Sequence, residues 1–262
     1  MLAITWPTVP NYTDTAVTNG QAVTNGQEID HPIGGQLTIR RDSTPRPTKS
    51  AEEIADLADA LKRDGYVVVP RVLGSRTRMD ALAAAKQMLG SPLTVGRDSG
   101  GDGMDGFRGA INHDRRFWPL ITQPDVLAVL GTVLSSNIRL LSSHIISLPS
   151  VVGMTKRTIR VPGNTGWHRD MYGVTRDLGW SSTPCLAVKC AYYLSPLEPN
   201  CGITTILPGS HLLARPPQIH AGEADPDQAI TPVMSQGDAL LFEIAHSTRA
   251  ASTNRPILGS PS

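Results

Sequence analysis

The first part of the chain that has a clear hydrophobic pattern begins near residue 50. The apolar residues that recur there at helical spacing are Ile54, Leu57, Ala58 and Leu61. Ser50 and Glu53 have the types and spacing of a capping box, and Gly65 suits the end of a helix. This pattern predicts an amphipathic helix that starts at Ser50. The apolar run at residues 66–70 then predicts a buried strand.

Two further helices are predicted downstream. One spans about residues 76–89. Its inward positions are expected to be Met79, Leu82 and Leu89. The other follows Pro124, because proline suits the first turn of a helix and apolar residues recur after it.

From about residue 138 the pattern changes to short β-rich runs, separated by clusters of Gly, Pro, Asn and Ser. The predicted strands are residues 138–148, 158–161, 186–194, 203–207 and 239–244. Helices followed by many strands without intervening helices favour helices packed on an antiparallel barrel. We therefore expect an α+β fold, mainly β: a double-stranded β-helix (a jelly-roll or cupin-like barrel) with the N-terminal helices packed on one sheet.

Composition divides the chain into two parts. Residues 1–49 are rich in Thr, Asn, Gly and Pro and have few large apolar residues, which is typical of a poorly ordered arm. The whole chain has 262 residues, 40% of them hydrophobic, which is enough for one sizeable core. We expect a poorly ordered N-terminal arm at residues 1–49 and a single domain at residues 50–262.

Charge and cysteine usage narrow the class of protein. The net charge of +1 gives no global bias toward nucleic acid or an anionic membrane. No apolar run approaches the roughly 18 residues that a membrane-spanning helix needs. Cys185, Cys190 and Cys201 lack the spacing of a metal site and fit unpaired thiols in a reducing compartment. With no convincing secretory signal, these features predict a cytoplasmic protein with no nucleic-acid or membrane partner.

The tripeptide His168-Arg169-Asp170 is the first candidate for chemistry. In an extended segment, residues two apart point to the same side, so His168 and Asp170 can reach one metal ion while Arg169 points away. Taken alone, such a tripeptide occurs by chance, and a His beside an Asp on a surface is usually only a polar pair.

Downstream residues make a metal site more specific. His246 directly follows the apolar run 239–245, where a third ligand at the end of a core strand is well placed. Two histidines and one carboxylate leave positions open on an iron ion, which oxygen chemistry requires. Arg255, nine residues further on, could bind a distal carboxylate through two parallel hydrogen bonds. Iron with an inward Arg suits a chelating 2-oxoacid that has a second carboxylate.

Several segments together resemble one enzyme family, the phytanoyl-CoA dioxygenase family of iron(II)/2-oxoglutarate oxygenases. The similarity covers roughly residues 52–258, and its specificity lies in the ordered set of segments rather than in any one of them. The segments are residues 64–70 (DGYVVVP), 167–170 (WHRD), 192–194 (YYL), 200–211 (from NCG to LPGSH) and 237–242, followed by His246 and Arg255.

The resemblance implies a role for each matching residue. It implies His168, Asp170 and His246 as iron ligands. It also implies Arg255 as the partner of the 2-oxoglutarate C5 carboxylate, assisted by the hydroxyl of Thr248. The implied cofactors are Fe(II), 2-oxoglutarate as co-substrate, and O2.

Two other polar residues are weaker candidates. Alternation puts Lys189 on one side of its strand with Ala191 and Tyr193, either lining a pocket or lying on the surface. His211 belongs to the loop at residues 208–211, which in the resembled family is structural, so it is not expected to be a ligand.

The function implied is oxidation, first of all hydroxylation, of a C–H bond in a small organic molecule of specialised biosynthesis, with succinate and CO2 as co-products. Asp170 argues against halogenation, since halogenating relatives replace this carboxylate. An amino-acid or acyl-CoA hydroxylase, a non-catalytic relative that acts as a binding or partner subunit, and a cupin-like metal protein that uses no 2-oxoacid stay open. The few residues after Arg255 also suggest a homo-oligomer or a partner chain that completes the barrel.

Overall fold

The structure is a computed structural model of the whole chain. It describes residues 2–5, 46–91, 97–99, 105–147, 167–179, 183–195, 204–213, 215, 217, 219, 225–245 and 247–250.

The first long helix, α1 (Ala51–Asp64), begins where the sequence predicts it. Both halves of the capping box are present: the Glu53 backbone N–H donates to Ser50 Oγ at 3.1 Å, and the Ser50 N–H donates to the Glu53 carboxylate at 2.7 Å. Gly65 ends the helix with a φ of 77°, a left-handed conformation that glycine adopts without strain. The chain then turns directly into strand β2 (Tyr66–Val69).

The two other predicted helices are α2 (Ser75–Leu89) and α5 (Pro124–Val133), the latter with its proline in the first turn. For α2 the predicted inward face is only partly right. Leu89 is partly buried and packs against the main core, but Met79 is 53% exposed, and the buried residues are Ala81, Ala84, Ala85 and Met88. Alanines let this helix pack close to its neighbours, so the buried side is the one with small residues. The remaining helical elements are α3 (Ala110–His113), η2 (Arg115–Phe117), α4 (Trp118–Ile121), α6 (Tyr172–Leu178) and η3 (Ser210–Leu212).

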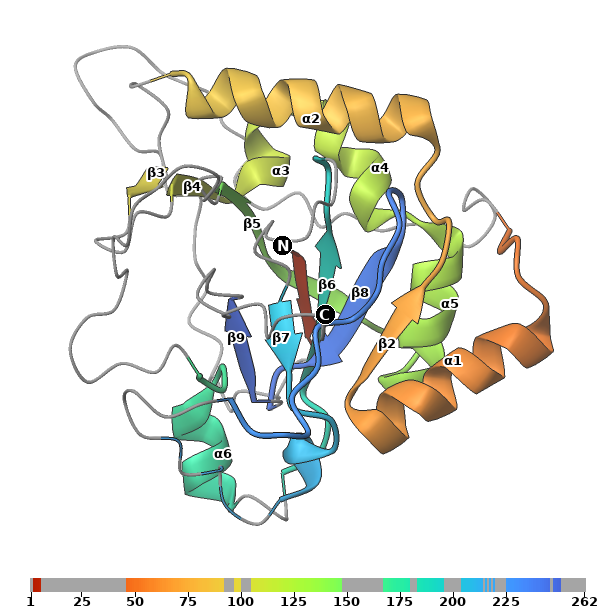
Figure 1. Cartoon of the computed structure of the whole chain (residues 1–262). Coiled ribbons are helices and arrows are strands. Elements are labelled where there is room, and N and C mark those ends of the chain that lie inside the picture. Colours follow the sequence, from red (N-terminus) through yellow and green to blue (C-terminus); the bar gives the residue numbers. More distant parts are fainter. Residues whose placement is uncertain are drawn as a thin grey trace, which may run out of the picture.

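Most strands belong to one antiparallel sheet. Its members are β1 (Leu2–Thr5), β2, β3 (Arg97–Ser99), β4 (Asp105–Arg108), β5 (Arg139–Ser147), β6 (Ala187–Tyr192) and β8 (Ala239–Glu243). Within the described ranges their order is β2-β8-β6-β1-β5-β4-β3, so β8 and β6 lie between β2 and β1 (Figure 1). A second, two-stranded sheet pairs β7 (Thr204–Ile206) with β9 (Thr248–Ala250).

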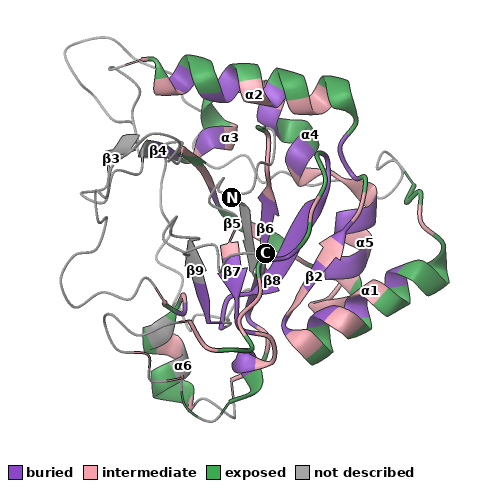
Figure 2. Ribbon diagram, viewed as in Figure 1, coloured by how far each residue is buried: buried purple, intermediate pink, exposed green. Residues whose placement is uncertain are grey.

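The large sheet has two buried faces. One face, which includes Val188 and Leu241, packs against α1, α2 and α5 in the main hydrophobic core. The other face, which includes Ala191 and Phe242, packs against Ile206 of β7. Every residue of β8 is buried, as the colouring of Figure 2 shows. The structure thus confirms a mixed fold with helices on one side of an antiparallel sheet; its closure into a jelly-roll barrel stays a prediction.

The N-terminal strand is not anticipated by the sequence analysis. Leu2–Thr5 lies in the arm expected to be poorly ordered, yet it forms β1 and pairs with both β5 and β6. Residues 6–45 lie outside the described residues, so the division into an arm and a single domain stays a prediction. Among the helices that the structure describes, none combines the length and the apolar character needed to cross a membrane.

Candidate metal centre

The first two expected ligands lie just before α6, on a segment that is tied to the small sheet. The His168 backbone N–H donates to the Thr248 carbonyl at 2.9 Å, and the Thr248 N–H donates back to the His168 carbonyl at 3.0 Å. Residues 168 and 248 therefore face each other in an antiparallel bridge. The structure brings one expected ligand, His168, beside one expected co-substrate residue, Thr248.

Side chains alternate along this segment as the sequence analysis expects. His168 is exposed and Asp170 is half-buried, whereas Arg169 between them is only 7% exposed. Successive residues of an extended segment point to opposite sides. The imidazole and the carboxylate are thus on the side away from the interior that Arg169 enters.

Asp170 contacts a cation from the large sheet. The Lys189 ammonium, on β6, donates to Asp170 Oδ2 and forms an ion pair with it. The two side chains are 15% and 29% exposed, respectively. Lys189 hence lines the site beside Asp170, one of the two readings left open for it.

The residues described fit a divalent metal in the chemistry of their donors. An imidazole and a carboxylate are ligand types that suit non-haem iron. Within the described residues no three His, Cys, Asp or Glu side chains form a metal-binding group. The third expected ligand, His246, and the expected carboxylate partner, Arg255, lie outside the described residues. Thr248 is described and is 3% exposed.

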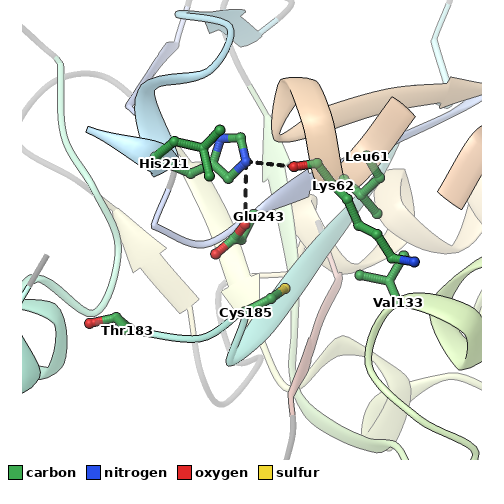
Figure 3. Close-up of a pocket in the computed structure, with 8 residues that line it drawn as sticks. Leu61, Lys62, Val133, Thr183, Cys185, His211 and Glu243 are labelled. Carbon is green, nitrogen blue, oxygen red and sulfur yellow. Dashed lines mark hydrogen bonds and ion pairs between the residues drawn. The ribbon is translucent and has the colours of Figure 1, made fainter. Parts of the chain in front are cut away.

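A second polar cluster lies behind the ligand segment, next to the C-terminal end of α1. It surrounds a cavity of about 200 Å³ that is lined by His211, Glu243, Cys185 and Lys62 among others (Figure 3). His211 Nε2 lies 3.0 Å from the Lys62 backbone carbonyl and 3.9 Å from Glu243 Oε2. This placement agrees with a structural role for the loop at residues 208–211.

Burial dominates the ionisation of this cluster. It raises the pKa of Glu243 to about 7, although the nearby Arg169 guanidinium acts in the opposite direction. Burial also lowers the pKa of His211, so the imidazole is neutral near pH 7 and its contact with Glu243 is not an ion pair there. The sequence analysis overlooked Glu243; the signal was a lone acid inside the otherwise apolar run 239–245.

The described cysteines are free thiols, as predicted. Burial raises the pKa of Cys190 to about 12, and it also raises the pKa of Cys185. Both thiols therefore stay protonated and unreactive at neutral pH. Cys201 lies outside the described residues.

Comparison with known proteins gives the family. The phytanoyl-CoA dioxygenase family matches residues 61–256, which include both His168 and Asp170. The chain belongs to the phytanoyl-CoA dioxygenase family. The resemblance expected from the sequence is thereby confirmed, and with it the family's cofactors, iron(II) and 2-oxoglutarate.

Among the solved structures that are similar to this chain, two come from nogalamycin biosynthesis. The epimerase SnoN, in complex with Fe3+, alpha-ketoglutarate and nogalamycin RO, is 25% identical with a TM-score of 0.56, covering 79% of this chain and 80% of that chain. The alpha-ketoglutarate-dependent carbocyclase SnoK from nogalamycin biosynthesis is 20% identical with a TM-score of 0.55, covering 79% of both chains, and shows the shared fold. Among curated proteins no match was found.

Proposed function

We propose that this member of the phytanoyl-CoA dioxygenase family is an iron(II)/2-oxoglutarate-dependent enzyme that oxidises a C–H bond of a small organic molecule in natural-product biosynthesis. His168, Asp170 and His246 would hold the iron. Arg255 would bind the C5 carboxylate of 2-oxoglutarate, and the Thr248 hydroxyl would assist it.

The observation that carries this proposal is the bridge between residues 168 and 248. In an antiparallel pair, two steps forward along one segment correspond to two steps back along the other. Continued by two residues, this register would place residue 246 opposite residue 170. This register supports a site in which Asp170 and His246 act together with His168.

The chain itself would contribute ligation, orientation and exclusion of water. When bound, iron and 2-oxoglutarate supply, with O2, an oxidant that removes a hydrogen atom from the substrate and leave succinate and CO2. Asp170 contributes a negative charge that offsets part of the charge of the metal. The burial of Thr248 and of the sheet face behind it keeps one side of the site dry.

The similarity to SnoN favours a substrate made by specialised metabolism. We infer hydroxylation as the first reaction to test, because Asp170 is present and the family resemblance of the sequence implies this reaction first. Epimerisation is the second candidate, since SnoN is an epimerase and is 25% identical over 79% of this chain. We also expect the two sheets to close as a jelly-roll barrel, either within one chain or with a second copy.

Anaerobic titration of the metal-free protein with Fe(II) and 2-oxoglutarate tests the site. A saturable visible charge-transfer band is expected for the parent protein, because 2-oxoglutarate would bind directly to the iron that these residues would hold. Asp170→Ala and His168→Ala should lose the band, and Arg255→Ala should need far more 2-oxoglutarate. Asp177→Ala is the control, since Asp177 lies in the same region but is 68% exposed and pairs with Arg176.

A folded parent protein with no band would contradict the proposal and favour a non-catalytic binding subunit. Where the band is present, succinate release should identify substrates from a panel of polycyclic and glycosylated compounds. Mass spectrometry of the products then separates the two reactions: hydroxylation adds one oxygen atom, whereas epimerisation leaves the mass unchanged.

A further inference from the structure

Between the two proposed ligands of the described segment lies a buried cation. Arg169 is 7% exposed, although its neighbours His168 and Asp170 reach the solvent side. An arginine buried to this degree is kept only where hydrogen bonds and charge offset the cost of removing it from water.

The guanidinium contacts the second ligand-bearing segment. Arg169 Nε donates to Ser247 Oγ at 3.0 Å, and Nη2 donates to the backbone carbonyl of Ser210. The Ser247 N–H in turn donates to Ser210 Oγ at 2.8 Å. Ser247 stands between His246 and Thr248 in the chain, as Arg169 stands between His168 and Asp170. One side chain therefore joins the segment of His168 and Asp170 to the segment that contains His246 and Thr248.

The loop that accepts these bonds is itself fixed to the end of α1. The Gly209 N–H donates to the Asp64 carbonyl at 2.9 Å, and His211 contacts the Lys62 carbonyl at 3.0 Å. The Glu243 N–H donates to the Gly65 carbonyl at 2.9 Å. Figure 3 shows His211 between Lys62 and Glu243 at this helix end. Because α1 is packed into the main core, the loop that accepts the hydrogen bond of Arg169 is attached to a well-packed part of the fold.

Burial works against the charge of Arg169, so its hydrogen bonds must offset that cost. Burial lowers the pKa of the guanidinium, and the Glu243 carboxyl group acts in the opposite direction. The guanidinium has five donors in a planar fork, so it can bind a hydroxyl and a carbonyl at fixed angles. A lysine would keep the charge but could not reproduce the fork.

We propose that Arg169 is a positioning residue of the metal centre: through Ser247 and the Ser210 carbonyl it sets the distance between the segment of His168 and Asp170 and the segment of His246. This inference rests on the proposed function, because it assumes that both segments hold the iron. Arg169 is buried on the side opposite His168 and Asp170, so it would act through the two segments and not as a ligand.

Four variants test the proposal at a temperature well below their unfolding transitions. Arg169→Met removes the charge and the donors, Arg169→Lys keeps the charge alone, and Ser247→Ala removes one acceptor. Ser143→Ala is the matched control, since Ser143 is also a buried serine whose Oγ accepts a backbone hydrogen bond, from Ile111 at 3.2 Å, but on β5. Fe(II) affinity is measured by anaerobic calorimetry with metal alone and then by the charge-transfer band with 2-oxoglutarate.

The expected result is a graded loss of Fe(II) affinity in the folded protein. Residues that orient metal ligands typically change affinity by about 10- to 100-fold. We expect that loss for Arg169→Met, a smaller one for Ser247→Ala and partial recovery in Arg169→Lys, whereas Ser143→Ala should lower only the melting temperature.

Two outcomes would overturn the inference, and they differ from a failure of the proposed function. If the parent binds Fe(II) and the folded Arg169→Lys and Ser247→Ala proteins bind it equally well, the hydrogen bonds of Arg169 only stabilise the fold. If Arg169→Met does not fold, these two variants still decide the question. If the parent binds no Fe(II), the proposed function itself fails, and the positioning role fails with it.

Discussion

Replacing Lys189 by methionine tests how a fixed positive charge beside Asp170 affects the metal. The Lys189 ammonium pairs with Asp170 Oδ2, and both side chains are partly exposed to solvent, at 15% and 29%. A divalent ion held by Asp170 must either displace this ammonium or stay beside it, and both cost free energy. Lys189→Met should therefore bind Fe(II) more tightly than the parent protein.

The size of the effect follows from the charges. Two unit charges about 4 Å apart interact by about 1 kcal/mol in a water-like dielectric, and a divalent ion doubles this to about 2 kcal/mol. Partial exposure of both side chains keeps the effective dielectric high, so larger values are not expected. A gain of about 1–2 kcal/mol corresponds to a Kd for Fe(II) that is roughly 5- to 30-fold lower.

Anaerobic calorimetry with Fe(II) in the absence of 2-oxoglutarate measures this Kd directly. Lys86→Met is the control, because Lys86 is an exposed residue of α2 and its loss changes the net charge equally. If Lys189→Met binds Fe(II) no better than the parent, or worse, the reasoning is refuted: the ammonium would then support the ligand instead of competing with the metal.

Three further predictions concern stability. Burial raises the pKa of Glu243 from 4.5 to about 7, so folding favours the protonated acid. The free energy of unfolding should then fall by about 3 kcal/mol as the pH rises from about 4.5 to about 7. Urea unfolding of Glu243→Gln should lack most of this decline. An equal decline in this variant would contradict the ionisation of Glu243 as its cause. Gly237→Ala should lower the free energy of unfolding by at least about 2 kcal/mol, measured by thermal unfolding, because φ is +92° and the new Cβ would lie 2.6 Å from a backbone carbonyl oxygen. Gly74→Ala is its control, because a Cβ at Gly74 would have no atom within 4 Å. Asp125→Ala should lower the urea midpoint by the equivalent of about 2–4 kcal/mol, since this buried carboxylate accepts three hydrogen bonds from residues 48 and 49; a midpoint within error of the parent's would show that these bonds contribute little.

Elements with local signals could be predicted from the sequence. The capping box of Ser50 and Glu53, the left-handed Gly65 and the proline of α5 each act within a few residues of the chain, so no tertiary information is needed. The β-rich runs from residue 138 onward also became strands where the structure describes them. Strand β1 carries no such signal, because its place depends on pairing with residues far away in the chain.

The buried face of α2 could not be predicted from the sequence, for a different reason. A hydrophobic pattern gives weight to large residues such as Met79, whereas the close packing of this helix selects the side with alanines. Which side of a helix fits closely against its neighbour depends on the shape of that neighbour, so the sequence of the helix alone does not determine it.

The candidate site shows the same division. The alternation of His168, Arg169 and Asp170 follows from the two-residue period of an extended segment and was predictable. The contacts of Lys189 with Asp170 and of Arg169 with Ser247 join distant parts of the chain, so one sequence does not reveal them. The positions of His246 and Arg255 in space stay predictions.

The bridge between residues 168 and 248 also links metal binding to folding. Because it joins two segments that are far apart in the chain, an unfolded molecule cannot present both to one ion. Iron would then bind the native state alone, and an excess of free metal about 100-fold above its Kd would raise the free energy of unfolding by about 2.7 kcal/mol. Cells or buffers poor in iron would therefore hold a less stable protein, and its abundance would follow the supply of the metal.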